Sequence, residues 1–279
     1  MTIDTLAPWL RCPVCAEPLE RVERLTLGCA SGHRFDVNKR GFVNLVAGGT
    51  GLIGDSAEML DARETILESG LYSPISNALA ALGAGTRVLD AGVGTGYYLR
   101  AVLAAHPDAR GLAMDLSPTA VARAVRASPG IDGLVADTWR PLPIRDGVCD
   151  VILDVFAPRN LPEFHRILKP AGSLLVVVPL HDHLAELRAG GRMLEVPADK
   201  AAAIVASAAP KFTLREHRAI RATIPLTDAT GAALIAMGPS AHHPGPGPEA
   251  DAPGSPAPVR QAVPSTATLA VDVLHLVRI

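Results

Sequence analysis

Aromatic residues are scarce in this sequence, at 4% of the 279 residues, and neither sign of charge is in excess. The formal net charge is only −2, because 26 Lys and Arg stand against 28 Asp and Glu. Few rings are therefore available to bind bases by stacking, and the balanced charge excludes the broad basic field that many nucleic-acid-binding proteins carry. A nucleic-acid partner would need a local patch of Lys and Arg.

Long apolar runs are also missing, since no window reaches the ~18 apolar residues of a membrane-spanning helix. Residues 1–5 lack the basic and apolar segments that begin a secretory signal. Cysteine is rare, and three of the four cysteines lie in the first thirty residues, which is not the spacing of a disulfide framework. Because hydrophobic residues reach 48%, we expect a folded, cytoplasmic, reduced protein without a membrane partner.

The N-terminal segment contains four potential metal ligands at the spacing of a metal-binding site. Cys12 and Cys15 flank a two-residue turn, and Cys29 and His33 form a second pair about one hairpin later. This pattern is typical of a Cys₃His zinc site, and so short a segment has too little core to fold without the metal. We therefore expect a structural zinc ion. Segment 11–40 carries six Lys or Arg against four Asp or Glu, a modest excess that could contact phosphate or form a solvated rim.

Residues 87–99 have the pattern of a strand, a tight turn and the start of a helix, with Asp90 followed by Gly92, Gly94 and Gly96. Glycines let the backbone pass close under a ligand. The spacing Asp-x-Gly-x-Gly-x-Gly differs from the dinucleotide fingerprint. It resembles motif I of class I S-adenosylmethionine (SAM) methyltransferases. That resemblance implies that Asp90 and free backbone N–H groups hold the amino-acid end of SAM; a glycine-rich turn of another α/β protein is the alternative.

From residue 87 onward, strands and helices alternate, which predicts an α/β fold with a doubly wound, mostly parallel, Rossmann-like sheet. Asp115 ends the second strand, where nucleoside cofactors have their ribose hydroxyls held. Ser117 and Pro118 then predict a helix start. Asp137 follows the third strand. The resemblance to SAM methyltransferases implies that it accepts the adenine amino group of the cofactor; a turn-forming Asp is the alternative. We expect strands at residues 87–90, 111–114, 133–136, 151–153, 174–178, 212–226 and 268–279.

Composition divides the chain into four parts. Residues 1–46 are expected to form a zinc-binding module and residues 47–84 a helical connector. Residues 85–238 and 265–279 are expected to form the methyltransferase domain. Residues 239–264, dense in proline and glycine, are expected to form a flexible excursion.

Several further motifs occur in the same order: residues 36–45, residues 54–59, Ala157-Pro158 and His183-Leu184. Together with the zinc ligands and the glycine turn, they resemble the 23S rRNA (guanine-N1)-methyltransferase family. Within that family the chain is most similar to the branch associated with resistance to tylosin and related macrolides. The resemblance covers about residues 10–190.

The resemblance implies a class I SAM-dependent methyltransferase with a small N-terminal zinc module. It implies zinc at Cys12, Cys15, Cys29 and His33. It implies SAM contacts at Tyr72, Gly94, Thr95 and His183, with Asp115 at the ribose. It also implies that residues 1–46 are an RNA-recognition module, and that the protein is a homodimer whose zinc modules flank a cleft for a 23S rRNA hairpin.

The implied reaction is a direct transfer of a methyl group from SAM to N1 of a guanine in a domain-II hairpin loop of 23S rRNA. N1 carries a proton that must leave, so a carboxylate near the methyl group is expected to accept it. Asp154, which follows a predicted strand, is the first candidate and Asp137 is the second. Asp154 could instead only stabilise a turn.

Two other functions are compatible with the sequence. A SAM methyltransferase that acts on a small natural product would suit the balanced charge, but it leaves the zinc module without a task. A non-catalytic, zinc-containing RNA-binding adaptor is the second alternative. The intact Asp90, Gly92, Gly94, Gly96 and Asp115 argue against it.

Overall fold

The structure, a computed structural model, describes residues 3–46, 48, 54–188, 195–197, 199–238 and 264–279. The excursion expected at residues 239–264 lies outside the described residues except for its last position. None of the helices in the described ranges has the length and apolar character needed to cross a membrane.

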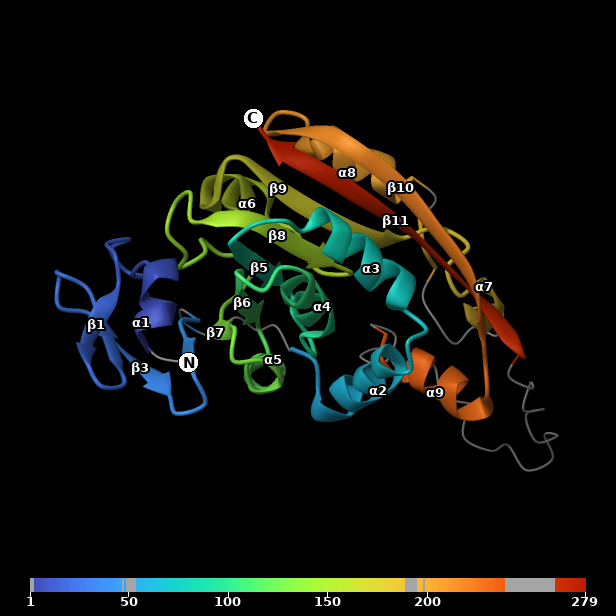
Figure 1. Cartoon of the computed structure of the whole chain (residues 1–279), viewed down its shortest axis with the longest axis horizontal. Helices are drawn as coiled ribbons and strands as arrows, with labels where there is room; N and C mark the ends of the chain where they lie inside the picture. The colour runs from blue at the N-terminus through green and yellow to red at the C-terminus, as the bar shows by residue number, and fades with distance from the viewer. Residues whose placement is uncertain (1–2, 47, 49–53, 189–194, 198, 239–263) are drawn as a thin grey trace, which may run out of the picture.

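One mixed sheet of eleven strands runs through the described part of the molecule (Figure 1). Its centre consists of five parallel strands, which in spatial order are β7 (Ile131–Val135), β6 (Arg110–Asp115), β5 (Arg87–Ala91), β8 (Cys149–Val155) and β9 (Leu168–Pro179). Two long antiparallel strands, β11 (Thr266–Arg278) and β10 (Phe212–Pro225), complete one edge. All seven strands expected from residue 87 onward are present, and the mostly parallel, doubly wound sheet is confirmed.

At the other edge, the zinc module continues the sheet. Its strands are β1 (Glu20–Glu23), β2 (Thr26–Gly28), β3 (Arg34–Asn38) and β4 (Phe42–Asn44). The last of these, β4, pairs in parallel with β7. A Cβ added to Gly133 of β7 would lie 2.6 Å from Cβ of Phe42, so the glycine allows β4 to approach closely. The module is therefore joined to the central sheet by backbone hydrogen bonds as well as by the chain.

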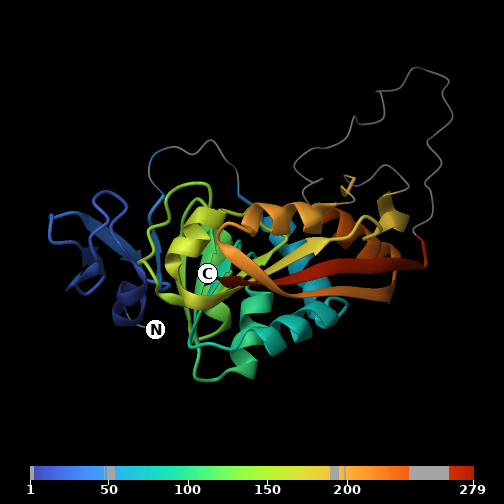
Figure 2. The ribbon, with the colours of Figure 1, turned by 90° about the horizontal axis from the view of Figure 1, so that it is seen from above.

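Helices cover both faces of the central sheet (Figures 1 and 2). One apolar core includes side chains of α2 (Ala57–Glu68), α3 (Ser73–Leu82), α4 (Tyr97–Ala105), α5 (Pro118–Ala127) and α9 (Asp228–Ala236). The core on the other face includes side chains of α1 (Ile3–Leu6), 3₁₀ helix η1 (Ala7–Trp9), α6 (Leu161–Ile167) and α8 (Lys200–Ala208). A short helix, α7 (Ala185–Arg188), follows β9. The expected connector helices α2 and α3 thus pack into the methyltransferase core.

Two helix starts follow local sequence signals. The Ser56 side chain accepts a hydrogen bond from the backbone N–H of Met59 at the start of α2. The Ser117 side chain does the same for Ala120, with Pro118 in the first turn of α5. Both hydroxyls satisfy backbone donors that have no partner inside the helix.

Candidate active site and metal centre

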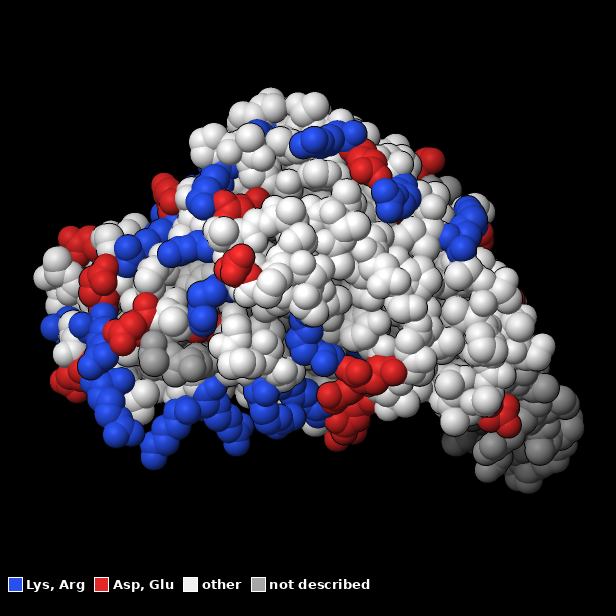
Figure 3. Space-filling model, in the orientation of Figure 1, with Lys and Arg blue, Asp and Glu red and all other residues white. Residues whose placement is uncertain are grey.

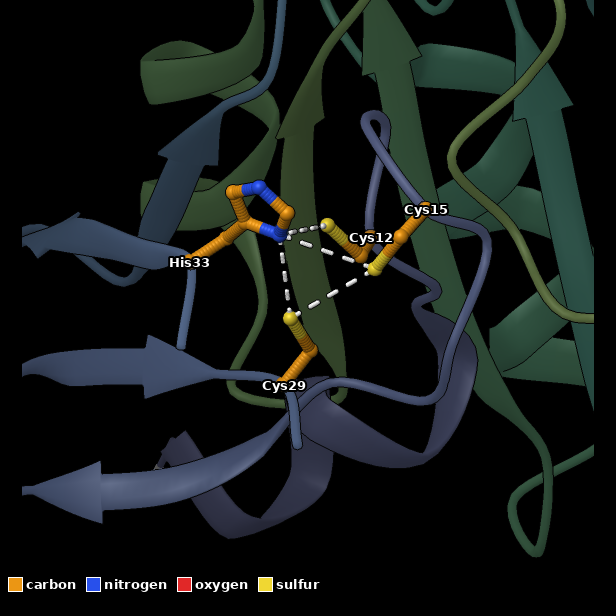
Figure 4. A group of neighbouring side chains, drawn as sticks. All are labelled: Cys12, Cys15, Cys29 and His33. Carbon is orange, nitrogen blue, oxygen red and sulfur yellow. Dashed lines mark hydrogen bonds between the residues drawn. The ribbon is translucent and has the colours of Figure 1, made fainter. Parts of the chain in front are cut away.

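The four predicted metal ligands meet in one cluster on two tight turns (Figure 4). His33 Nδ1 lies 3.3 Å from the Cys29 sulfur and 3.6 Å from the sulfurs of Cys12 and Cys15. The sulfurs of Cys15 and Cys29 are also 3.6 Å apart. A tetrahedron with Zn–S of about 2.3 Å and Zn–N of about 2.0 Å has edges of about 3.5–3.8 Å, so the donor set fits zinc closely.

Four protein ligands fill a tetrahedral shell, which leaves no position for substrate. Around the cluster, Glu17 accepts hydrogen bonds from the backbone N–H and the hydroxyl of Ser31, both at 2.9 Å, and ties the two turns together. The zinc centre is therefore structural. The reaction must occur elsewhere on the chain.

The glycine turn after β5 has the backbone conformation that its sequence predicts. Gly92, Gly94 and Gly96 have φ values of +89°, +51° and +80°, which favour glycine. A Cβ on Gly96 would lie 2.8 Å from Cβ of Ala124, so this glycine allows α5 to approach. Thr95 is buried in the same turn, at 5% exposed. A Cβ on Gly92 would lie 2.6 Å from Cβ of Ala157, so Gly92 is also packed against its neighbour. At Gly94 the nearest atom to an added Cβ is Nη1 of Arg63, at 3.1 Å, so Gly94 is the position where a ligand can approach the backbone.

Asp90, at the end of β5, is a buried carboxyl with an unused oxygen. It is 2% exposed, and its Oδ2 has no hydrogen-bond partner among the described residues. Burial raises its pKa to about 8, with Asp115 contributing in the same direction. A buried acceptor without a partner is costly, and the ammonium group of SAM would satisfy it.

Asp115, at the end of β6, is held by the turn next to it. One carboxylate oxygen accepts the backbone N–H of Gly94 at 3.0 Å, and the other accepts that of Ser117 at 2.9 Å. Burial raises the pKa of Asp115, and these two N–H groups oppose the rise. Each oxygen keeps a lone pair for a further donor, as a ribose diol requires. A hollow of about 330 Å³ lies beside it, lined in part by Leu116, Ser117 and Val135.

Sequence reasoning missed Arg63 of α2. Its guanidinium binds Asp55 and donates to the backbone carbonyl of Met237 at 3.0 Å. Its Nη1 lies 3.1 Å from where a Cβ on Gly94 would be, so it is beside the glycine turn. A signal for it exists, because Arg63 is three or four residues from the buried Leu60, Ile66 and Leu67, and so stands on the apolar side of its helix.

Tyr72, Phe156 and His183 form a triangle of rings. Tyr72 meets the other two edge-on, with centroids 6.5 Å and 6.3 Å away, and Phe156 stacks on His183 at 6.0 Å. Phe156 is 43% exposed and has φ +55°, an uncommon conformation for a bulky residue that often marks a functional site. The hydroxyls of Tyr72 and Tyr98 are buried without a hydrogen-bond partner in the described part of the chain.

His183 is neutral near pH 7. Burial, helped by Arg188, lowers its pKa to about 4. Its Nδ1 accepts the backbone N–H of Ala270 at 3.2 Å, which leaves the proton of the neutral ring on Nε2. A neutral ring beside two other aromatic rings attracts a sulfonium cation, whereas an imidazolium would repel it.

The two candidate proton acceptors lie apart, because β7 and β8 are separated by β6 and β5. Asp137, just after β7, accepts the backbone N–H of Trp139 at 2.9 Å. Asp154, in β8, is fully buried, and its Oδ1 accepts from Arg159 at 3.0 Å. Burial raises the pKa of Asp154 well above its usual range, which Arg159 opposes, and its Oδ2 has no partner among the described residues.

These features fit SAM. Unused polar atoms of Asp90, Tyr72 and Tyr98 suit the amino-acid end, the three rings suit the sulfonium, and Asp115 suits the ribose. The strand order and this crevice define a class I SAM-dependent methyltransferase that carries a structural zinc ribbon.

Comparisons with known proteins identify the family. The family described as RlmA, N-terminal, matches residues 10–47, and that described as methyltransferase domain matches residues 88–172. The 23S rRNA (guanine(748)-N(1))-methyltransferase of Streptomyces fradiae is 45% identical over 84% of this chain and 86% of its own length. A candidate 23S rRNA (guanine-N1)-methyltransferase of Micromonospora griseorubida is 42% identical over 85% of this chain and 88% of its own.

A solved structure supports the fold. A chain from the complex of the Haloferax volcanii Trm112 methyltransferase activator with a candidate methyltransferase matches with a TM-score of 0.52 and 21% identity. The match covers 80% of this chain and 98% of that one. With these relatives in hand, the chain belongs to the 23S rRNA (guanine-N1)-methyltransferase family.

Proposed function

We propose that this protein transfers a methyl group from SAM to N1 of a guanine in a domain-II hairpin loop of 23S rRNA. The observation that carries the proposal is 45% identity along most of both chains to the S. fradiae 23S rRNA (guanine(748)-N(1))-methyltransferase. The joined zinc ribbon and SAM crevice support it, because a small-molecule methyltransferase has no need of the ribbon.

The residues around the glycine turn hold the cofactor in this proposal. Asp90 accepts its ammonium group, Arg63, which lies beside Gly94, binds its carboxylate, and Asp115 binds the ribose hydroxyls. Asp137, on the side of β6 and β7, accepts the adenine amino group. Bound SAM supplies a methyl group already activated on a sulfonium, so the protein mainly positions the two partners.

The target guanine is expected beside the rings of Tyr72, Phe156 and His183. A base in a hairpin loop is partly unstacked already, so moving it into a pocket costs less than from a duplex. The exposed ring of Phe156 offers a stacking surface. Asp154 accepts the N1 proton on its unpaired Oδ2, which requires the ionised carboxylate. Burial disfavours that form by raising the pKa of Asp154, and the hydrogen bond and charge of Arg159 favour it.

Methylation of deproteinised 23S rRNA tests this function. Labelled methyl groups from SAM should enter 23S rRNA, and nuclease digestion should release them as N1-methylguanosine. Label in a panel of small natural products but not in rRNA would favour the small-molecule alternative. Failure to bind SAM at millimolar concentration would favour the non-catalytic adaptor.

Three further expectations accompany this function. Resistance to tylosin-type macrolides should appear in a susceptible bacterium that expresses the chain, and an unchanged inhibitory concentration would remove this role. The protein is proposed to act in the cytoplasm, where its ribosomal substrate is. It is also proposed to be a homodimer, which light scattering of the purified protein tests.

A further inference from the structure

The zinc ribbon and the methyltransferase domain share a basic groove that the reaction itself does not explain. A hollow of about 430 Å³ is lined by Arg40 and Phe42 from the β3–β4 hairpin and by Arg123 and Arg126 from α5. Acidic residues of α2, Asp61 and Glu64, form a further wall. Figure 3 shows Lys and Arg side chains gathered along the lower side of the molecule, from the zinc ribbon to the region below α5.

The three arginines differ in their partners. Arg123 is neutralised by Asp61 at 2.6 Å and Glu64 at 3.0 Å. Arg40 and Arg126 are exposed, and neither has a carboxylate within ion-pair distance in the ranges that the structure describes. Two unneutralised cations beside the same hollow repel each other weakly, and an anion between them would remove that repulsion.

The groove is held in a fixed shape. Arg40 precedes β4, and β4 pairs with β7 from Phe42 to Asn44. The close contact between Phe42 and Gly133 fixes the spacing between the hairpin and the sheet. A preformed spacing between cations lowers the entropy lost when a chain of phosphates binds.

The groove also continues toward the cofactor crevice. Pro118, at the start of α5, lines both this hollow and the smaller one beside Asp115. A polyanion lying along the groove therefore reaches the edge where the parallel strands end, which is the edge that holds the glycine turn.

We propose that this groove, defined by Arg40, Phe42, Arg123 and Arg126, binds the phosphate backbone of the RNA substrate next to its target loop. The inference rests on the proposed function for the identity of the RNA. Arg40 and Arg126 contact phosphates, Arg123 stays paired with α2, and the acidic residues of α2 limit the track on that side. Phosphate contacts of this kind position the substrate without reading its sequence.

The salt dependence of RNA binding tests the proposal on the full chain. A domain-II hairpin transcript of 23S rRNA is titrated with protein in filter-binding assays over a series of KCl concentrations. Each lost phosphate contact lowers the slope of log K against log salt by about 0.7–0.9. The double variant Arg40→Gln/Arg126→Gln should therefore lose about 1.4–1.8 from the slope and bind about tenfold more weakly at low salt.

A matched variant separates the groove from a general effect of charge. Arg215→Gln/Arg218→Gln removes two exposed cations from β10, at the opposite edge of the sheet, and should leave the slope unchanged. Affinity for S-adenosylhomocysteine, measured by calorimetry, should be the same in all three proteins. An unchanged slope in the groove variant, or an equal loss in both variants, would overturn the proposal.

Methylation of the same transcript distinguishes this inference from the proposed function. The groove variant should raise KM for RNA and keep kcat at saturating RNA. If the salt slope differs between the wild-type protein and the groove variant as expected, but the wild-type protein methylates no rRNA, the proposed function fails and the groove stands. If it methylates rRNA and the slopes are equal, the groove fails and the function stands.

Discussion

Asp90 carries its proton in the cofactor-free protein near neutral pH, because its pKa is raised from 3.8 to about 8. An ammonium group placed against it favours the ionised form, so cofactor binding must release the proton. Below about pH 8, affinity for S-adenosylhomocysteine should rise about tenfold per pH unit, and above that it should level off. Calorimetry between about pH 6 and pH 9 measures this.

The variant Asp90→Asn is the control for that prediction. It cannot ionise, so its weaker affinity should be flat over the same range. A flat profile in the wild-type protein would mean that Asp90 does not meet the ammonium group.

Asp154 and Asp137 can be told apart by kinetics. Asp154→Asn should lower kcat by about 10²–10⁴-fold if this carboxylate accepts the N1 proton. Asp137→Asn should instead raise KM for SAM, because Asp137 is proposed to accept the adenine amino group. Cofactor affinity and thermal stability show whether each variant is folded. A wild-type kcat in a folded Asp154→Asn protein would exclude Asp154 as the proton acceptor.

At the scale of the element, the glycine turn and α5 are coupled through one close contact. Gly96 has φ +80° and no room for a Cβ against Ala124, whereas Gly70 has the same φ and nothing within 4 Å of its added Cβ. Gly70→Ala should cost about 1–2 kcal/mol, from backbone strain alone. Gly96→Ala should cost at least about 1–3 kcal/mol more, from overpacking.

Urea denaturation of the two variants measures both costs. Adding Ala124→Gly to Gly96→Ala should recover only part of the overpacking cost, because Cα of Ala124 would still lie 3.0 Å from the added Cβ and a glycine inside α5 is itself destabilising. Equal destabilisation by Gly70→Ala and Gly96→Ala would show that α5 can shift away from the added methyl group without a loss of stability.

Local signals made most elements predictable from sequence. Ser56 and Ser117 specify helix starts, and the apolar runs before Asp90 and Asp115 specify parallel strands. The pairing of β4 with β7 was not predictable. A strand of three residues is too short to show the alternation of apolar and polar residues that marks a strand, and its partner lies far along the chain. Arg63 was missed for a related reason: its role depends on the distant Gly94 and Met237.

On the scale of the whole molecule, the zinc ribbon and the sheet share one core. Leu19 and Leu27 of the ribbon belong to the same buried cluster as Leu134 and Ile144 of the methyltransferase domain. The ligand set was predictable, since its spacing is local, but the joint core was not. Loss of metal should therefore disturb the packing between the ribbon and the methyltransferase domain as well as the fold of the ribbon itself.

Removal of one zinc ligand tests that coupling. Cys12→Ser should lose bound zinc and lower Tm by about 10 °C, which corresponds to roughly 3–5 kcal/mol for a chain of this size. Cys149, buried in β8 away from the cluster, supplies the control: Cys149→Ala should keep one zinc per chain. Wild-type zinc content and Tm in Cys12→Ser would refute the structural metal site.

The most direct test of the account is to map reverse-transcription stops on 23S rRNA from cells with and without the protein. A methyl group on guanine N1 blocks Watson–Crick pairing, so reverse transcriptase halts there. The account predicts a new stop at one guanine in a domain-II hairpin loop, present with the wild-type chain and absent with Asp90→Asn. Identical stops in cells with and without the protein would contradict it.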